Sequence, residues 1–171
     1  MIALNDFLSH LLMVLGKELQ LQNELLQAAE EKKDLLLKNH IEELVPLLER
    51  EMDLVTQVRD TEKQLSDVWK NMVEQCNLEP GELALSRIIE LSPPDLALKF
   101  SEIQIELKRV LKTLQEINLQ NAILINDTLH YIDVVFSLLM GEEKNKFYSP
   151  LGKEEEKSAR ESKGILINGI I

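Results

Sequence analysis

The sequence predicts an all-α fold: an elongated antiparallel helical bundle or coiled coil, with one very long C-terminal helix and a flexible tail. Of the 171 residues, 44% are hydrophobic but only 4% are aromatic, and there are six Gly and five Pro. This composition is typical of helices and supplies little of the turn chemistry that a β-protein needs. Apolar residues also recur every three or four positions over long segments, as on one face of a helix.

The charge divides the chain into two parts. Residues 1–141 hold 24 acidic and 13 basic side chains, whereas residues 142–171 hold six of each, so the whole net charge of −11 lies in the first part. We therefore expect a helical bundle over 1–141 and a flexible tail over 142–171. Proteins that bind nucleic acid present a basic face, so we expect no nucleic-acid partner.

Other features favour a cytoplasmic location. The single cysteine, Cys76, excludes an internal disulfide framework. No positive charge precedes Lys17, which argues against a secretory signal. The longest apolar runs are too short to cross a bilayer, so we expect no stable membrane insertion.

The first two predicted helices cover residues 4–38 and 45–76. Lys38-Asn39-His40 ends or bends the first helix. Pro46 fits the first turn of the second, where its missing N–H is tolerated; a kinked helix that continues through Pro46 is the alternative. The stripes assigned to the two helix cores are Leu8, Leu11, Leu15, Leu19, Leu26, Ala29 and Leu36, and Leu48, Met52, Val55, Leu65, Trp69 and Met72.

A short helix over 82–91 leads to a last helix over 93–140. Ser92 is a suitable N-cap, and proline fits the first turn that follows it. At about 1.5 Å per residue this last helix is roughly 70 Å long. Steps of three and four form an unbroken heptad seam: Phe100, Ile103, Leu107, Val110, Leu114, Ile117, Asn121, Leu124, Thr128, Tyr131, Val135 and Leu138.

The second half of this helix has a wider apolar arc than the first. Another apolar row runs beside the seam, so either the other helices or a partner must cover it. Asn121 lies on the seam itself, where a polar residue can set register and partner number, or can form a hydrogen-bonded layer inside a bundle. The predicted binding surface comprises Asn118, Asn121, Ile125, Leu129, Ile132, Phe136 and Leu139.

The motifs of common enzymes are missing from the sequence. There is no Gly-rich phosphate loop, CxxC, HExxH or GxSxG motif, and no Glu-x-x-His pair for a di-iron site. His130 stands between Asp127 and Asp133 at three-residue spacing, which is the pattern of a solvated polar face and much less that of a metal site. We expect no catalytic residue, no cofactor and no metal.

The tail contains apolar residues that an inert terminus would not need. It is polar up to Gly164, with Phe147 and Tyr148 exposed in that context, and it closes on an Ile/Leu-rich stretch. Such a segment can fold onto a partner or back onto the bundle, and the alternative is a frayed terminus. The candidate tail contacts are Phe147, Tyr148, Gly152, Ile165, Leu166 and Ile167.

The order of these features resembles FlgN-like flagellar export chaperones. The resemblance rests on Lys32-Lys33-Asp34-Leu35-Leu36-Leu37, Asn39-His40-Ile41-Glu42-Glu43-Leu44, and Leu47-Leu48-Glu49-Arg50-Glu51-Met52-Asp53-Leu54 in the first two helices. It continues with Asn118-Leu119-Gln120-Asn121-Ala122-Ile123-Leu124-Ile125 and Leu129 in the last helix, and with Tyr148 and Gly152 beyond it. The residues between Asn77 and Pro94 add nothing to it.

The resemblance implies a cytoplasmic chaperone of flagellar type III secretion, without catalytic activity. Members bind hook–filament junction proteins, keep them unassembled and deliver them to the export gate. The last helix and tail would then contact the client, and the tail tyrosine, here Tyr148, would contact the gate. The alternative from another class is a self-associating coiled-coil scaffold without a client, in which the long helix pairs in a homodimer.

Overall fold

The computed structural model describes residues 2–76 and 85–140, and it confirms the all-α prediction over these ranges. The described residues form four helices and no strand: α1 (Ile2–Lys38), α2 (Ile41–Cys76), α3 (Leu85–Leu91) and α4 (Pro94–Met140). The last of these is a single helix of 47 residues. The predicted tail over 142–171 lies outside the described residues.

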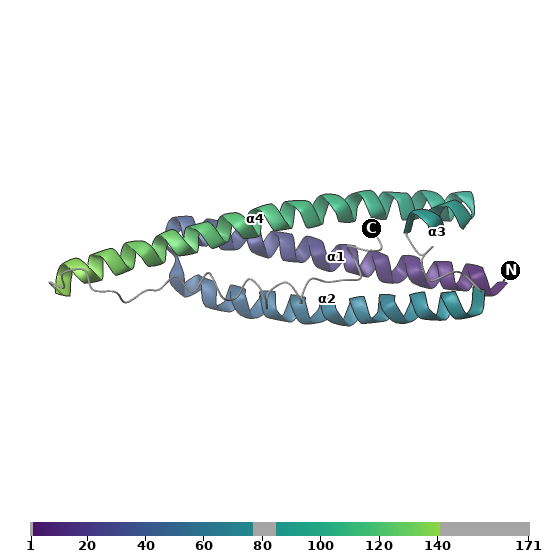
Figure 1. Cartoon of the computed structure of the whole chain (residues 1–171), viewed down its shortest axis with the longest axis horizontal. Helices are drawn as coiled ribbons and strands as arrows, with labels where there is room; N and C mark the ends of the chain where they lie inside the picture. Colours follow the sequence, from purple (N-terminus) through teal and green to yellow (C-terminus); the bar gives the residue numbers. More distant parts are fainter. Residues whose placement is uncertain (1, 77–84, 141–171) are drawn as a thin grey trace.

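The three long helices lie side by side, with α1 in the middle. Helices α1 and α2 form an antiparallel hairpin, and α4 runs along a different flank of α1, in the same direction as α1 (Figure 1). The short α3 packs against α4 near its first residues. The free end of α4 extends past the turn between α1 and α2 (Figure 1).

The largest part of the core lies at the end where all four helices meet. Leu11 of α1, Met72 of α2, Leu85 of α3 and Phe100 of α4 are fully buried there. Two smaller clusters continue the α1–α2 interface toward the hairpin turn, and the second of these contains no residue of α4. The core therefore thins along the molecule, from four helices at one end to two at the other.

The turn between α1 and α2 is a Schellman motif, as a helix stop at Lys38-Asn39-His40 requires. The N–H of Asn39 donates to the carbonyl of Leu36, and the N–H of His40 donates to the carbonyl of Leu35. Asn39 has a φ of 58°, in the left-handed region that asparagine tolerates better than most residues. These bonds satisfy two carbonyls that the helix end would otherwise leave without partners.

Two predicted helix starts were wrong. Helix α2 begins at Ile41, so Pro46 lies in its sixth position; the alternative that the sequence left open, a helix that continues through Pro46, is the one observed. Ser92 does not cap α4, because its hydroxyl donates to the carbonyl of Ile88 at 2.6 Å and so completes the end of α3. The N-cap of α4 is Pro93, whose carbonyl accepts from the N–H groups of Leu96 and Ala97.

The predicted stripe of α2 was also wrong in its first half. Leu48, Met52 and Val55 are exposed, and the helix instead packs against α1 through a row displaced by one residue. Leu65, Trp69 and Met72, in the second half, are buried as predicted. The residues that face the core in the first half are Leu47, Leu54 and Val58.

Candidate functional site

The burial of α4 ends abruptly at Asn121. Phe100, Leu107 and Val110 of the predicted seam are completely buried, and Asn121 is the last buried residue. Residues 122–140, here called the distal segment, are exposed except for the half-buried Leu124 and Val135. The described helices therefore do not cover this segment, which was one of the two possibilities that its wide apolar arc left open.

A hydrogen bond marks the point where burial stops. The side-chain amide nitrogen of Asn121 donates to the backbone carbonyl of Ala29 in α1, at 2.8 Å. Its amide oxygen is buried without a partner in the described residues. A buried polar group that is only half satisfied is tolerated where it fixes a geometry. Asn121 thus sets the register of α4 on α1 from inside the bundle.

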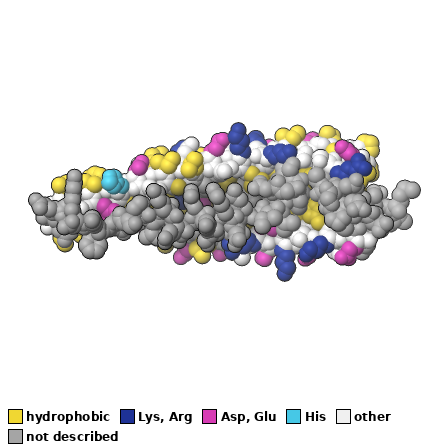
Figure 2. All heavy atoms as spheres, viewed as in Figure 1, with side chains coloured by type: hydrophobic (Ala, Val, Ile, Leu, Met, Phe, Trp, Pro, Cys, Tyr) yellow, Lys and Arg dark blue, Asp and Glu magenta, His cyan; other side chains and the backbone are white. Residues whose placement is uncertain are grey.

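The distal segment presents large apolar side chains to solvent. Figure 2 shows hydrophobic side chains gathered over the free end of α4. Phe136 is 61% exposed and Leu139 is 80% exposed. Exposed apolar patches of this extent mark interaction sites in soluble proteins. The large exposed hydrophobic residues here are Ile123, Ile125, Leu129, Tyr131, Ile132, Val134, Phe136, Leu138, Leu139 and Met140.

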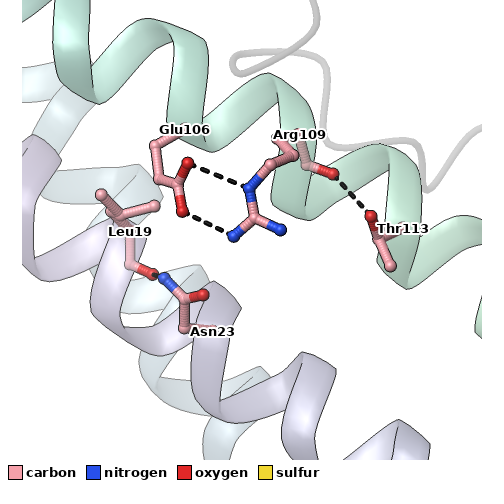
Figure 3. Close-up of polar contacts among 5 residues, drawn as sticks. All are labelled: Leu19, Asn23, Glu106, Arg109 and Thr113. Atoms are coloured by element: carbon pink, nitrogen blue, oxygen red, sulfur yellow. Dashed lines mark hydrogen bonds and ion pairs between the residues drawn. The ribbon is translucent and has the colours of Figure 1, made fainter.

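Residues 94–121, here called the proximal half of α4, carry polar contacts on their solvent side. This side carries an ion pair between Glu106 and Arg109, and the hydroxyl of Thr113 donates to the carbonyl of Arg109 (Figure 3). On neighbouring α1, the side chain of Asn23 donates to the carbonyl of Leu19. All of these bonds stay within one helix. The apolar seam therefore holds the proximal halves together, and the distal segment continues this seam with only Leu124 and Val135 half-buried by the described residues.

The predicted binding residues divide at Asn121. Ile125, Leu129, Ile132, Phe136 and Leu139, here called the α4 row, are all exposed and share one face at helical spacing. Asn118 is exposed beside them, whereas Asn121 is buried and committed to Ala29. Phe147, Tyr148, Gly152, Ile165, Leu166 and Ile167 lie outside the described residues.

The polar residues of the distal segment form no metal cluster. Asp127, His130 and Asp133 are all exposed. Within the described ranges there is no group of three or more His, Cys, Asp or Glu side chains that could hold a metal ion.

The distal segment also gives α4 the length and composition of a membrane-crossing helix. An 18-residue window of α4 has a mean hydropathy of 1.4, and none of it is buried. The predicted limit on apolar runs did not anticipate this. One such helix is weak support for a membrane span, and Asp127 and Asp133 would each oppose insertion by about 3 kcal/mol near the bilayer centre.

A buried carboxylate lies in the bundle away from the distal segment. Glu18 of α1 is 1% exposed, and one of its oxygens accepts from the side-chain amide of Gln22 at 2.7 Å. Its other oxygen has no partner in the described residues. Burial raises the pKa of Glu18, and the nearby charge of Glu62 raises it further.

A second apolar face, on α2, escaped the sequence reasoning. It lies at the same end of the molecule as the α1–α2 turn, and Met52 within it is 71% exposed. Leu48, Met52 and Val55 of this face were predicted to lie in the core because they alternate in steps of three and four like a buried stripe, and Ile41 and Val45 were assigned to no stripe. This face, here called the α2 row, comprises Ile41, Val45, Leu48, Met52 and Val55.

Comparison with known proteins identifies the family. The family model described as FlgN protein matches residues 1–156. The chain belongs to the FlgN family. Searches of curated proteins and of solved structures return no match.

Membership of the FlgN family indicates a chaperone of flagellar biogenesis that binds flagellar substrate proteins. Chaperones of this family are soluble proteins of the cytoplasm. The matched range includes all four helices and the distal segment of α4. The exposed apolar end of α4 therefore belongs to the part of the chain that the family shares.

Proposed function

We propose that this FlgN-family chain is an export chaperone for hook–filament junction proteins and that its α4 row is the client-binding surface. The exposed apolar distal segment beyond Asn121 is the main support for this proposal. A client helix that buries its apolar face on this row would be shielded from assembly, and area and shape would supply the affinity. The chain would act by binding alone, without catalysis.

Delivery to the type III export gate forms the second part of the proposal. The tail residues Phe147, Tyr148 and Gly152, together with the Ile165–Ile167 stretch, are the proposed contacts with the client and the gate. Folding a tail onto a partner costs a few kcal/mol of the interaction energy, which keeps the complex reversible. Reversible binding suits a protein that must release its cargo for export.

The test uses calorimetry with the hook–filament junction proteins from the same source. The double variant Leu129→Asp/Phe136→Asp places two charges in the α4 row without touching the core, because both side chains are exposed. Fully burying a Leu or Phe side chain contributes about 1.5–3 kcal/mol. We therefore expect the double variant to bind at least 100-fold more weakly.

The matched control is Ile105→Asp, which charges an exposed apolar residue in the proximal half of the same helix. It should bind like the native chain. A second comparison, between the full chain and a chain that ends at Gly141, isolates the tail. Undiminished client binding by a helical Leu129→Asp/Phe136→Asp variant would rule out the α4 row as the site.

The alternative is a coiled-coil scaffold in which the distal segments of two chains pair. The same exposed apolar surface favours it. Sedimentation equilibrium at tens of micromolar distinguishes the two functions, because the scaffold requires a dimer and the chaperone does not.

A further inference from the structure

The α2 row is as exposed as the α4 row, and the proposed function does not use it. Its five side chains follow heptad spacing along the first four turns of α2. In this stretch the α1-facing positions are Leu47 and Leu54, and the α2 row flanks them. An apolar row beside an occupied interface is the surface on which a further helix packs.

The α2 row and the α4 row point to the same side of α1. On α1, Lys32 donates to Glu51 of α2, and the next residue, Lys33, donates to Gln120 of α4. Successive residues of a helix are rotated by about 100° around its axis, so α2 and α4 lie about 100° apart around α1. Helix α2 is antiparallel to α1, and α4 is parallel to α1 (Figure 1). With right-handed helices, the residue after each α1-facing position then turns toward one shared side. Leu48 follows Leu47 in this way, and Ile125 follows Leu124.

The two rows also overlap along the molecule. The Lys32–Glu51 pair fixes the position of α2 along α1, and the Ala29–Asn121 bond fixes the position of α4 along α1, so residues of α2 and α4 can be placed at the same level. Counting one residue as about 1.5 Å, Leu48, Val45 and Ile41 lie level with Ile125, Leu129 and Ile132, in that order. The two rows therefore form facing apolar walls over about three helical turns, at the position that a fourth helix would occupy in a four-helix bundle.

The outer edges of both walls are acidic. Glu42 and Glu49 border the α2 row, and Asp133 borders the α4 row. None of these three carboxylates forms an ion pair with the described residues. Residues 41–55 and 122–140 together contain seven acidic side chains and one basic side chain. An occupant with basic flanks would complement these edges.

We propose that the α2 row and the α4 row together hold one amphipathic helix of the client, with Lys or Arg side chains flanking its apolar face. This inference rests on the proposed function and adds the second wall and the charge of the partner. A second copy of this chain would bring the same acidic edges and so like-charge repulsion. The chain's own stretch from Gly164 to Ile171 contains no charged side chain, and residues 142–163 before it balance six basic with six acidic side chains, so this part of the chain complements the acidic edges less well than a helix with basic flanks.

The experiment measures calorimetric binding of the full chain to the hook–filament junction proteins. The variant Val45→Asp/Met52→Asp charges the α2 row, and Met13→Asp charges an exposed residue on the opposite side of α1 as its control. We expect at least tenfold weaker binding for the first and native binding for the second. Circular dichroism checks that both variants remain helical.

The charge of the partner is tested with Glu42→Lys/Glu49→Lys. Native binding should weaken as salt rises from 50 to 500 mM, because salt screens exposed charges. The charge-reversed variant should bind more weakly at low salt and lose that dependence. Identical affinity and salt dependence in the two proteins would overturn the basic-flank assignment.

The remaining outcomes separate the two-walled site, the proposed function and pairing with a second copy of the chain. Native affinity of Val45→Asp/Met52→Asp, with binding lost in Leu129→Asp/Phe136→Asp, would overturn the two-walled site and leave the proposed function in place. Absence of binding by the native chain would overturn the proposed function and this inference with it. A native dimer in sedimentation that Val45→Asp/Met52→Asp dissociates would assign the α2 row to a second copy and overturn a client helix there.

Discussion

Replacing Asn121 by leucine should stabilise the bundle. Asn121 is 2% exposed, donates one hydrogen bond to the carbonyl of Ala29 and leaves its amide oxygen without a partner in the described residues. Losing the bond costs about 0.5–1.5 kcal/mol. The carbonyl of Ala29 is not stranded by this loss, because it is also placed to accept from the α1 backbone.

The gains exceed that cost. Removing a buried, unsatisfied polar atom recovers about 1–3 kcal/mol, and leucine buries additional apolar surface at a seam position that prefers it. We expect a net increase of about 1–3 kcal/mol in the free energy of unfolding. For a chain of this size that corresponds to roughly 2–4 °C in Tm per kcal/mol.

The assay is urea unfolding followed by circular dichroism, with Asn121→Asp as the matched opposite. The aspartate keeps the shape but replaces the donor with a charged acceptor facing the carbonyl of Ala29, so this variant should lose stability. Sedimentation of Asn121→Leu should in turn reveal more self-association than the native chain, because the polar residue that fixes register is gone. A helical Asn121→Leu variant that is at least about 1 kcal/mol less stable than the native chain would show that the hydrogen bond to Ala29 outweighs these gains.

Three further predictions concern the stability of the bundle. Burial raises the pKa of Glu18, so the folded chain binds the carboxyl proton of Glu18 more tightly than the unfolded chain does. The free energy of unfolding should therefore fall as pH rises above about 4.5, and Glu18→Gln should reduce this fall and raise Tm at pH 7. Pro46→Ala should stabilise α2 by about 1–2 kcal/mol in urea titrations, because it restores an interior N–H, and unchanged stability would contradict this. The Lys32–Glu51 pair is mostly buried, so Lys32→Ala should lower the free energy of unfolding by about 1–3 kcal/mol in thermal melts. Lys33→Ala removes an exposed contact and should lower it by less than about 0.5 kcal/mol, and equal losses would contradict the larger contribution of the buried pair.

The helices themselves could be predicted because their signals are local. The stop at Lys38-Asn39-His40 was confirmed, since asparagine tolerates the left-handed conformation that a Schellman motif needs. The long α4 was confirmed because its seam repeats without a break. Ser92 was misassigned because a serine between two helices can bond either of them, and only the packing of α3 on α4 decides which.

The surfaces could be predicted only where one apolar row exceeded its neighbours. On α4 the extra row was plain in the sequence, but whether the other helices or a partner covered it was left open. On α2 two rows of similar strength lie next to each other, and the one that faces α1 includes the polar residues Glu51 and Thr61. Periodicity therefore favoured the wrong row, because it does not register that Lys32 neutralises Glu51 within the interface.

The distal segment of α4 is the proposed client-binding surface. Amide hydrogen exchange on the chain, free and saturated with a hook–filament junction protein, tests it most directly. We expect weak protection of residues 122–140 in the free chain, because the described helices leave most of them exposed, and strong protection in the complex. A complex in which the exchange of residues 122–140 is unchanged, while other residues gain protection, would contradict it.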